Sequence, residues 1–240
     1  MRRLLTLLLL LAVPLWAAIA ATGTAGAAVG NGGNATIDTL GMGLVEGTVV
    51  IITGGHPYRS GASLGPLSGF TEIASSDVSG FSLGVWYQIV GATLPASFEC
   101  YGTGNALDAC AYVAIGLTGV DTTHIADTLA TAANGSSTNP DPASIVTVTD
   151  SAWVIACGGS EVNDGTPGVI SGYSNDVSDN ANDTYDATVA LATKLIVSAT
   201  TEDPGAWSTW ATGDWRTYTV AVRPEVTAPP TYNGDFFLMF

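Results

Sequence analysis

The sequence predicts an all-β protein: a two-sheet β-sandwich of jelly-roll type, built from two similar halves. Three observations favour this fold. The 29 glycines, with frequent Thr, Ser, Ala and Val, suit short strands and turns better than long helices. Apolar residues make up 47% of the chain, which is enough for a packed core. Short apolar runs alternate with turn residues at a spacing typical of sandwiches.

The two halves are predicted from a repeated pattern. The run TVVIITGGHP at residues 48–57 and the run AWVIACGGSE at residues 152–161 are both rich in Val and Ile, and each contains a Gly-Gly pair. A turn-rich loop, a Gly-aromatic turn and long strand-like runs follow each of them. We therefore expect half-repeats at about residues 45–120 and 145–224. One half alone would leave a sheet face bare, and two packed halves bury both faces.

The start of the chain has the layout of a secretory signal peptide. Two arginines precede an apolar run at residues 4–15, and small residues follow. Residues 18–20 (AIA) and 25–27 (AGA) are candidate cleavage sites. Residues 1–27 are therefore expected to form a signal peptide or an N-terminal apolar segment, with an uncleaved membrane anchor as the alternative. No other segment suits a bilayer span, so no stable span is expected after cleavage.

One β-sandwich domain is expected over residues 28–224, followed by a Pro-rich linker and an apolar tail over residues 225–240. The tail closes on five apolar residues, Phe236, Phe237, Leu238, Met239 and Phe240. An exposed apolar run usually marks a contact surface. The tail either folds back on its own sandwich or adds to a neighbour's sheet edge, and we expect a role in assembly.

The charge balance excludes one large class of partner. The chain has 6 basic and 21 acidic residues and a net charge of −15. Nucleic-acid binding needs Lys and Arg to displace counterions from phosphates, so no nucleic acid is expected. An anionic membrane surface is disfavoured for the same reason.

Five segments carry a resemblance: GFTEIA, GVWYQIVGATLPASFEC, AYVAIGLTGVD, SIVTVTDSAWVIACGG and GDWRTYTVAVRP. They resemble a diffuse group of β-sandwich proteins that are common in bacteriophage and metagenomic sequences and occur as secreted bacterial modules. The resemblance covers roughly residues 45–224, and its motifs are structural. It implies a virion- or tail-associated structural protein, or an extracellular adhesion-type module, and it carries over no catalytic residue. A secretory-type leader is unexpected on a phage particle protein and favours the secreted alternative.

We therefore expect a non-enzymatic structural or assembly protein, such as a phage virion or tail component or an extracellular fibre subunit. The expected location is the virion or the cell exterior, and the expected partners are further copies of the chain or other structural proteins. The alternative is a secreted module that binds glycans or cell surfaces. A glycoside hydrolase is a remote alternative, because no pair of acids stands out. Neither histidine has the spacing of a metal site or a catalytic triad.

Three groups of residues are candidates for binding or stabilisation. Trp207 and Trp210 can offer stacking faces to a cell-surface glycan, with core or rim packing as the alternative. Cys100 and Cys110 flank a turn-rich stretch and are candidates for a disulfide, with free buried thiols as the alternative. No cofactor is expected, although acidic residues of the stretch SNDVSDNANDTYD are weak candidates for calcium ligands, with a solvated hairpin loop as the alternative. These acids are Asp176, Asp179, Asp183 and Asp186.

Overall fold

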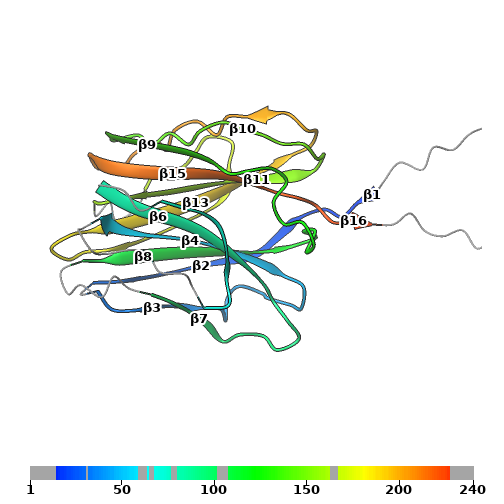
Figure 1. Cartoon of the computed structure of the whole chain (residues 1–240), viewed down its shortest axis with the longest axis horizontal. Coiled ribbons are helices and arrows are strands. Elements are labelled where there is room, and N and C mark those ends of the chain that lie inside the picture. Colours follow the sequence, from blue (N-terminus) through cyan, green and yellow to red (C-terminus); the bar gives the residue numbers. More distant parts are fainter. Residues whose placement is uncertain are drawn as a thin grey trace, which may run out of the picture.

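The protein is all-β and forms a two-layer sandwich of antiparallel sheets (Figure 1). The structure is a computed structural model that describes residues 15–30, 32–58, 64, 68–76, 80–101, 108–162 and 167–227. Every regular element in these ranges is a β-strand, which confirms the predicted fold class.

Two five-stranded sheets form the sandwich. The first sheet has the order β2 (Ala20–Val29), β8 (Cys110–Thr118), β4 (Val49–Tyr58), β6 (Gly80–Ile89) and β5 (Thr71–Ser76). The second sheet has the order β12 (Ser174–Ala181), β13 (Ala187–Ile196), β11 (Ala152–Ser160), β15 (Gly213–Val222) and β9 (Thr131–Ser137). Three two-stranded pairs complete the structure: β3 (Ala35–Asp38) with β7 (Ser97–Cys100), β10 (Ile145–Val146) with β14 (Thr201–Glu202), and β1 (Leu15–Trp16) with β16 (Val226–Thr227).

Each five-stranded sheet comes from one part of the chain. When the strands of a sheet are numbered in chain order, the first sheet reads 1-5-2-4-3 from β2 to β5, and the second reads 1-5-2-4-3 from β9 to β12. The jelly-roll connectivity is not confirmed, because consecutive long strands stay within one sheet. The likeness of the two halves beyond this strand order stays a prediction.

The sandwich has apolar packing on both faces of each sheet. Alternate residues of β4 show why: Val49 and Ile51 lie in the core shared by the two sheets, whereas Val50 and Ile52 lie in a second core on the outer face. The β3–β7 pair contributes to that outer core. Loop residues and the short strand β10 cover the outer face of the second sheet in the same way. A strand covered on both faces reads as a continuous apolar run, as these strands do.

The two Gly-Gly pairs make room for aromatic rings. The ring of Phe81 on β6 lies in the shared core, where a methyl group added at Gly55 or at Gly159 would overlap it. On the outer faces, a methyl group at Gly54 would overlap the ring of Tyr112, and one at Gly158 would lie 2.9 Å from the ring of Trp207. Each pair therefore lets a ring lie directly on the main chain on both faces of its strand.

The N-terminal part of the described chain belongs to the first sheet. Strand β2 pairs with β8 from Ala20↔Thr118 to Val29↔Cys110. Residues 20–27 of the predicted signal-peptide segment therefore lie within a strand. Cleavage after residue 27 would remove most of β2, whereas cleavage after residue 20 would keep residues 21–29.

The two ends of the described chain lie side by side. Leu15 is the Cα partner of Thr227, and the amide of Ala17 donates to the carbonyl oxygen of Glu225 at 2.8 Å. Figure 1 shows both ends at the same end of the sandwich. The predicted assembly residues Phe236, Phe237, Leu238, Met239 and Phe240 and most of the predicted leader lie outside the described residues.

Candidate functional site

The two predicted sugar-stacking tryptophans lie in the outer core of the second sheet. Trp207 is 1% exposed and Trp210 is 4% exposed. Their ring centroids are 5.7 Å apart at an interplanar angle of 60°, and the amide of Trp207 donates to the carbonyl oxygen of Pro140 at 2.9 Å. Because both rings are covered, neither face is open to a sugar, and the predicted stacking is wrong. Core packing, the stated alternative, describes both residues.

The four predicted calcium ligands do not form a metal site. Asp176 and Asp179 lie on β12, whereas Asp183 and Asp186 lie in the turn that follows it. The oxygens of Asp183 and Asp186 accept main-chain hydrogen bonds within that turn. Within the described ranges, no three His, Cys, Asp or Glu residues lie close enough together to hold an ion. The structure therefore gives no support to the calcium prediction.

Asp179 instead lies between the two sheets, where β12 packs against β2. A methyl group at Gly26 on β2 would lie 2.7 Å from Oδ2 of Asp179, so the carboxylate packs against the main chain of the opposite sheet. The amide of Asn180 donates to Oδ1 of Asp179 at 2.8 Å. Burial raises the pKa of Asp179, and this outweighs the lowering effect of that hydrogen bond.

We expect Asp179→Asn to stabilise the protein at neutral pH. Because burial raises the pKa of Asp179 in the folded state above its ordinary value of 3.8, the ionised carboxylate destabilises the fold. The wild type regains stability as the pH falls through the raised pKa, so the advantage of Asn should vanish below about 3.8. We expect a gain of only a few tenths of a kcal/mol, roughly, because the carboxylate keeps contact with water.

Urea unfolding across this pH range measures the gain, and a difference that does not change with pH would contradict it. Asp121→Asn supplies a comparison of opposite sign. The hydrogen bond from the Thr123 hydroxyl lowers the pKa of Asp121. In the wild type, the Asp121 carboxylate stabilises the fold above its unfolded-state pKa, and this stabilisation is lost as the pH falls through the lower folded-state pKa. Asp121→Asn should therefore lower stability at neutral pH, and the loss should vanish at low pH.

The two cysteines proposed for a disulfide are buried free thiols in the outer core of the first sheet. Cys100 pairs with Ala35 on β3, and Cys110 pairs with Val29 on β2. Burial raises the pKa of Cys100 to about 12 and that of Cys110 to about 11, so both thiols are protonated at neutral pH. Both thiols belong to the same apolar cluster on the outer face of the first sheet. Oxidation of the pair stays a prediction.

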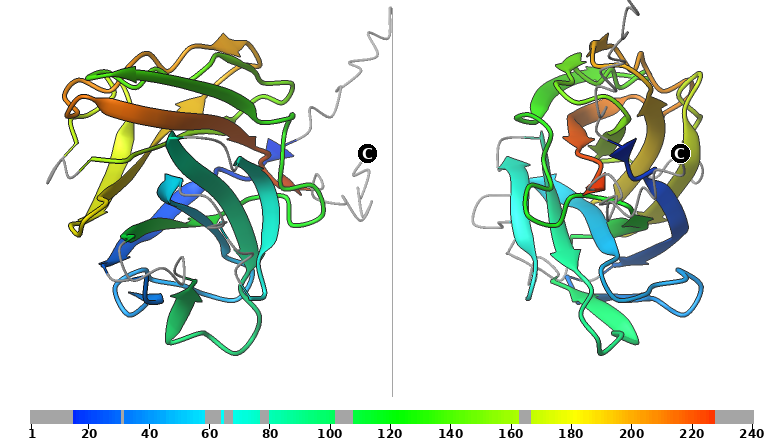
Figure 2. Two further views of the ribbon diagram at one scale, coloured as in Figure 1. Left: turned by 60° about the vertical axis from the view of Figure 1, so that its left-hand side comes forward. Right: turned by 90° about the vertical axis from the view of Figure 1, so that its right-hand side faces the viewer.

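One feature that the sequence pattern did not predict is the edge strand β9. It is the last strand of the second sheet and pairs with β15 without a register shift, from Ser137↔Gly213 to Thr131↔Thr219. Among the described strands, no other pairs with it. Its residues, TAANGSS, include no charge and no proline, and every second one is exposed. Figure 2 shows β9 at the margin of its sheet.

The other three edges of the two five-stranded sheets have features that oppose pairing with another strand, and β9 lacks them. Strands β2, β5 and β12 each have a register shift. In addition, β5 carries the exposed acid Glu72, and β12 presses Asp179 against β2. Bulges and charges of this kind prevent a sheet edge from pairing with another chain. Among the four edges of the two five-stranded sheets, β9 is therefore the one that is regular and uncharged.

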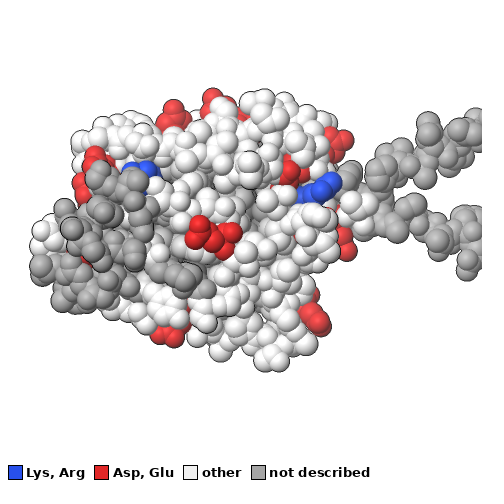
Figure 3. Space-filling model, in the orientation of Figure 1, with Lys and Arg blue, Asp and Glu red and all other residues white. Residues whose placement is uncertain are grey.

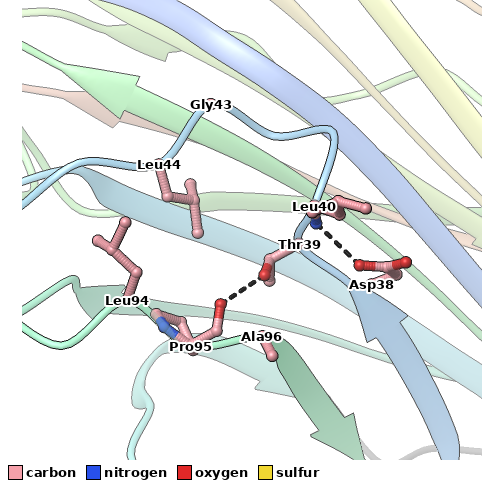
Figure 4. A pocket seen from close by; sticks show the side chains of 8 residues that line it. All are labelled: Asp38, Thr39, Leu40, Gly43, Leu44, Leu94, Pro95 and Ala96. Atoms are coloured by element: carbon pink, nitrogen blue, oxygen red, sulfur yellow. Dashed lines mark hydrogen bonds between the residues drawn. The ribbon is translucent and has the colours of Figure 1, made fainter.

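An apolar pocket lies at the end of the sandwich where β3 leads toward β4. Its volume is about 470 Å³. Its lining residues come from the loops at residues 38–44 and 94–96: Asp38, Thr39, Leu40, Gly43, Leu44, Leu94, Pro95 and Ala96. In Figure 4 the side chains of Leu44 and Leu94 point toward one another across the pocket.

Hydrogen bonds hold these two loops together. The Thr39 hydroxyl donates to the carbonyl oxygen of Pro95 at 2.5 Å, and the Thr39 amide donates to that of Ala96 at 3.2 Å. The amide of Leu40 donates to Oδ1 of Asp38 at 2.8 Å. The Leu40 side chain is left 91% exposed beside the pocket.

Comparison with known proteins does not add a functional assignment. No protein-family model matches the chain, and neither the curated proteins nor the solved structures include a significant match. In the part of the chain that the structure describes, no helix has the length and hydrophobicity needed to cross a bilayer.

Proposed function

We propose that this protein is a non-enzymatic assembly protein whose copies associate through β9. The observation that supports this function is the contrast among the four sheet edges, of which β9 alone is regular and uncharged. An open edge carries unpaired amide and carbonyl groups, and a strand from another chain can pair with them. The resemblance to virion and extracellular β-sandwich proteins leads us to place this assembly in a particle or an extracellular fibre.

Two β9 strands can pair antiparallel about a two-fold axis. Such an interface uses the same surface on both copies and joins two five-stranded sheets into one of ten strands. A register centred on Asn134 would bring each residue of TAANGSS opposite an uncharged one. Like charges placed directly opposite destabilise a strand pair, and this sequence has none.

Because the rest of the chain is strongly acidic, an uncharged edge is a favourable place for two copies to meet. The chain carries a net charge of −15, and Figure 3 shows acidic side chains spread over one face with few basic ones among them. Repulsion between copies should therefore oppose association at low salt. Added salt screens this repulsion over about 10 Å at 0.1 M, so the proposed association should strengthen as salt increases.

The expected result of Asn134→Lys is loss of self-association with the fold intact. Asn134 is exposed at the middle of β9, so lysine there places positive charges on both strands of the pair. We expect a dissociation constant at least about tenfold larger, which corresponds to about 1.4 kcal/mol. Sedimentation velocity over a range of protein concentrations measures the constant, and circular dichroism checks the fold.

Thr71→Lys on β5 is the matched control. It makes the same charge change at an exposed position of another edge strand, so it reports the effect of net charge alone. We expect it to leave association unchanged or to strengthen it slightly. A monomeric wild-type chain at every salt concentration would overturn the proposal, and so would a Thr71→Lys variant that dissociates as fully as Asn134→Lys.

A further inference from the structure

A polar pocket lies between the two sheets, beside the edge strand β9. Its volume is about 360 Å³. Its lining comes from Phe81 of β6, from residues 134–136 of β9 and from residues 214–216 of β15. Pockets that enclose a small molecule have volumes of about 300–1,000 Å³, so the space is large enough for a ligand of the size of one sugar ring.

Two side chains of β15 cross the gap to β6. Nε of Arg216 donates to the carbonyl oxygen of Phe81 at 2.5 Å. A methyl group at Gly80 would lie 2.7 Å from Oδ2 of Asp214, so this carboxylate packs against the first residue of β6. Residues two apart on a strand point to the same face. The pocket therefore places a guanidinium and a carboxylate next to each other.

Strand β9 adds two neutral hydrogen-bonding groups on the same face. Asn134 is the Cα partner of Arg216, and Ser136 is the Cα partner of Asp214. Side chains of directly opposed residues lie on one face of a sheet. Asn134 and Ser136 are both exposed, so an amide and a hydroxyl group are open to a ligand at this side of the sandwich.

The guanidinium of Arg216 has donors to spare. Besides Nε–H, it carries N–H groups on both Nη atoms. Within the described residues, no hydrogen bond or ion pair occupies those two atoms. Burial lowers the pKa of Arg216, which means that the charge has lost part of its hydration. A ligand oxygen that accepts from the Nη atoms would replace the lost water.

The surrounding charge favours a neutral ligand. The carboxylate of Asp214 beside Arg216 and the net charge of −15 both oppose an anion. Two adjacent hydroxyl groups match the pair instead, because a hydroxyl can both accept and donate. We propose that this pocket binds a neutral sugar, with one hydroxyl accepting from Nη of Arg216 and its neighbour donating to the carboxylate of Asp214.

The affinity of this site should be low. Phe81, which contributes to the lining, is 1% exposed, so its ring offers no face for stacking on a sugar. Binding then depends on hydrogen bonds that replace those to water, and each of these contributes little. We expect a dissociation constant of about 1–10 mM for a monosaccharide.

Titration of the full chain with glucose, galactose and mannose, each up to about 100 mM, tests the proposal by NMR. The amide signals of residues 134–136 and 214–216 and the Nε–H signal of Arg216 should shift and saturate for at least one sugar. Arg216→Lys and Asp214→Ala should each raise the dissociation constant at least about tenfold. Lysine keeps the positive charge, so this loss would come from the guanidinium N–H groups.

Asp141→Ala is the matched control, because Asp141 is an exposed acid outside this pocket. It should bind like the wild type, and circular dichroism checks the fold of all three variants. The proposal would be overturned by shifts that do not saturate with any of the three sugars, or by an unchanged affinity in Asp214→Ala. Glucuronate that binds more tightly than glucose would also overturn it, because a carboxylate would then be the preferred group.

Sugar binding does not rest on association through β9. The pocket uses side chains on the face of the sheet, whereas the proposed association uses the main chain of the strand edge. Arg216→Lys and Asp214→Ala leave the sequence of β9 unchanged. A failure of the sugar titration would therefore leave the sedimentation test of association standing.

Discussion

Phe81→Ala is expected to lower the free energy of unfolding by about 3–5 kcal/mol. The Phe81 side chain is 1% exposed and fills the space above Gly55 of its own sheet and Gly159 of the facing sheet. Because both of these positions are glycines, neither has a side chain that could fill the cavity. The loss therefore includes both the buried ring and the empty volume that it leaves.

Urea unfolding of the two chains measures this loss. Phe81→Leu is the control, because leucine keeps a large apolar side chain, and its cost should be clearly smaller. The carbonyl oxygen of Phe81 accepts from Nε of Arg216 at 2.5 Å, and neither substitution removes that main-chain acceptor. A cost below about 1 kcal/mol for Phe81→Ala would show that the two glycine-lined surfaces can close on each other.

Gly54→Ala should cost about 1–3 kcal/mol or more by overpacking. The added methyl group would overlap the ring of Tyr112, which is fully buried on the neighbouring strand. The ring has little freedom to move, because the Tyr112 hydroxyl donates to the carbonyl oxygen of Tyr101 at 2.5 Å. An ordinary glycine-to-alanine change in a strand is neutral or stabilising when space is available.

Two comparisons isolate the cause of this loss. Gly91→Ala adds the same methyl group where no atom lies within 4 Å, so its effect on stability should be neutral or slightly favourable. In a Tyr112→Ala background, the cost of Gly54→Ala should largely disappear, because the ring is gone. Thermal unfolding of the wild type, Gly54→Ala, Tyr112→Ala and the double variant measures the coupling free energy between the two positions. Additive losses would show that Tyr112 is not the obstacle.

The fold was predictable because its signals repeat along the chain. The runs around Ile51 and Ile155 are apolar at every position, and the structure places both in central strands that are covered on both faces. The Gly-Gly pairs marked the same place in each run, although only the structure shows that Phe81, Tyr112 and Trp207 lie against them. Jelly-roll connectivity was not readable, since strand composition does not specify strand order.

Most of the candidate site could not be predicted from the sequence. Trp207 and Trp210 lie in a loop that covers the second sheet, and their spacing does not distinguish a covered loop from an exposed one. The acids near Asp179 resembled a cation loop, yet half of them lie on a strand. The openness of TAANGSS depends on what pairs beside it, and the pocket at Leu40 and Leu94 joins loops about fifty residues apart.

The origin of each sheet in one part of the chain has a consequence for synthesis on the ribosome. Residues 20–118 contain every strand of the first sheet, so its ladder can form before the second sheet has been translated. Until the strands of the second sheet emerge, however, the inner face with Val49, Ile51, Val113 and Ile115 has nothing to pack against. At a translation rate of about 5–20 residues per second, this surface stays exposed for several seconds. A nascent chain stalled between the two sheets is therefore a natural substrate for chaperones that bind apolar strands.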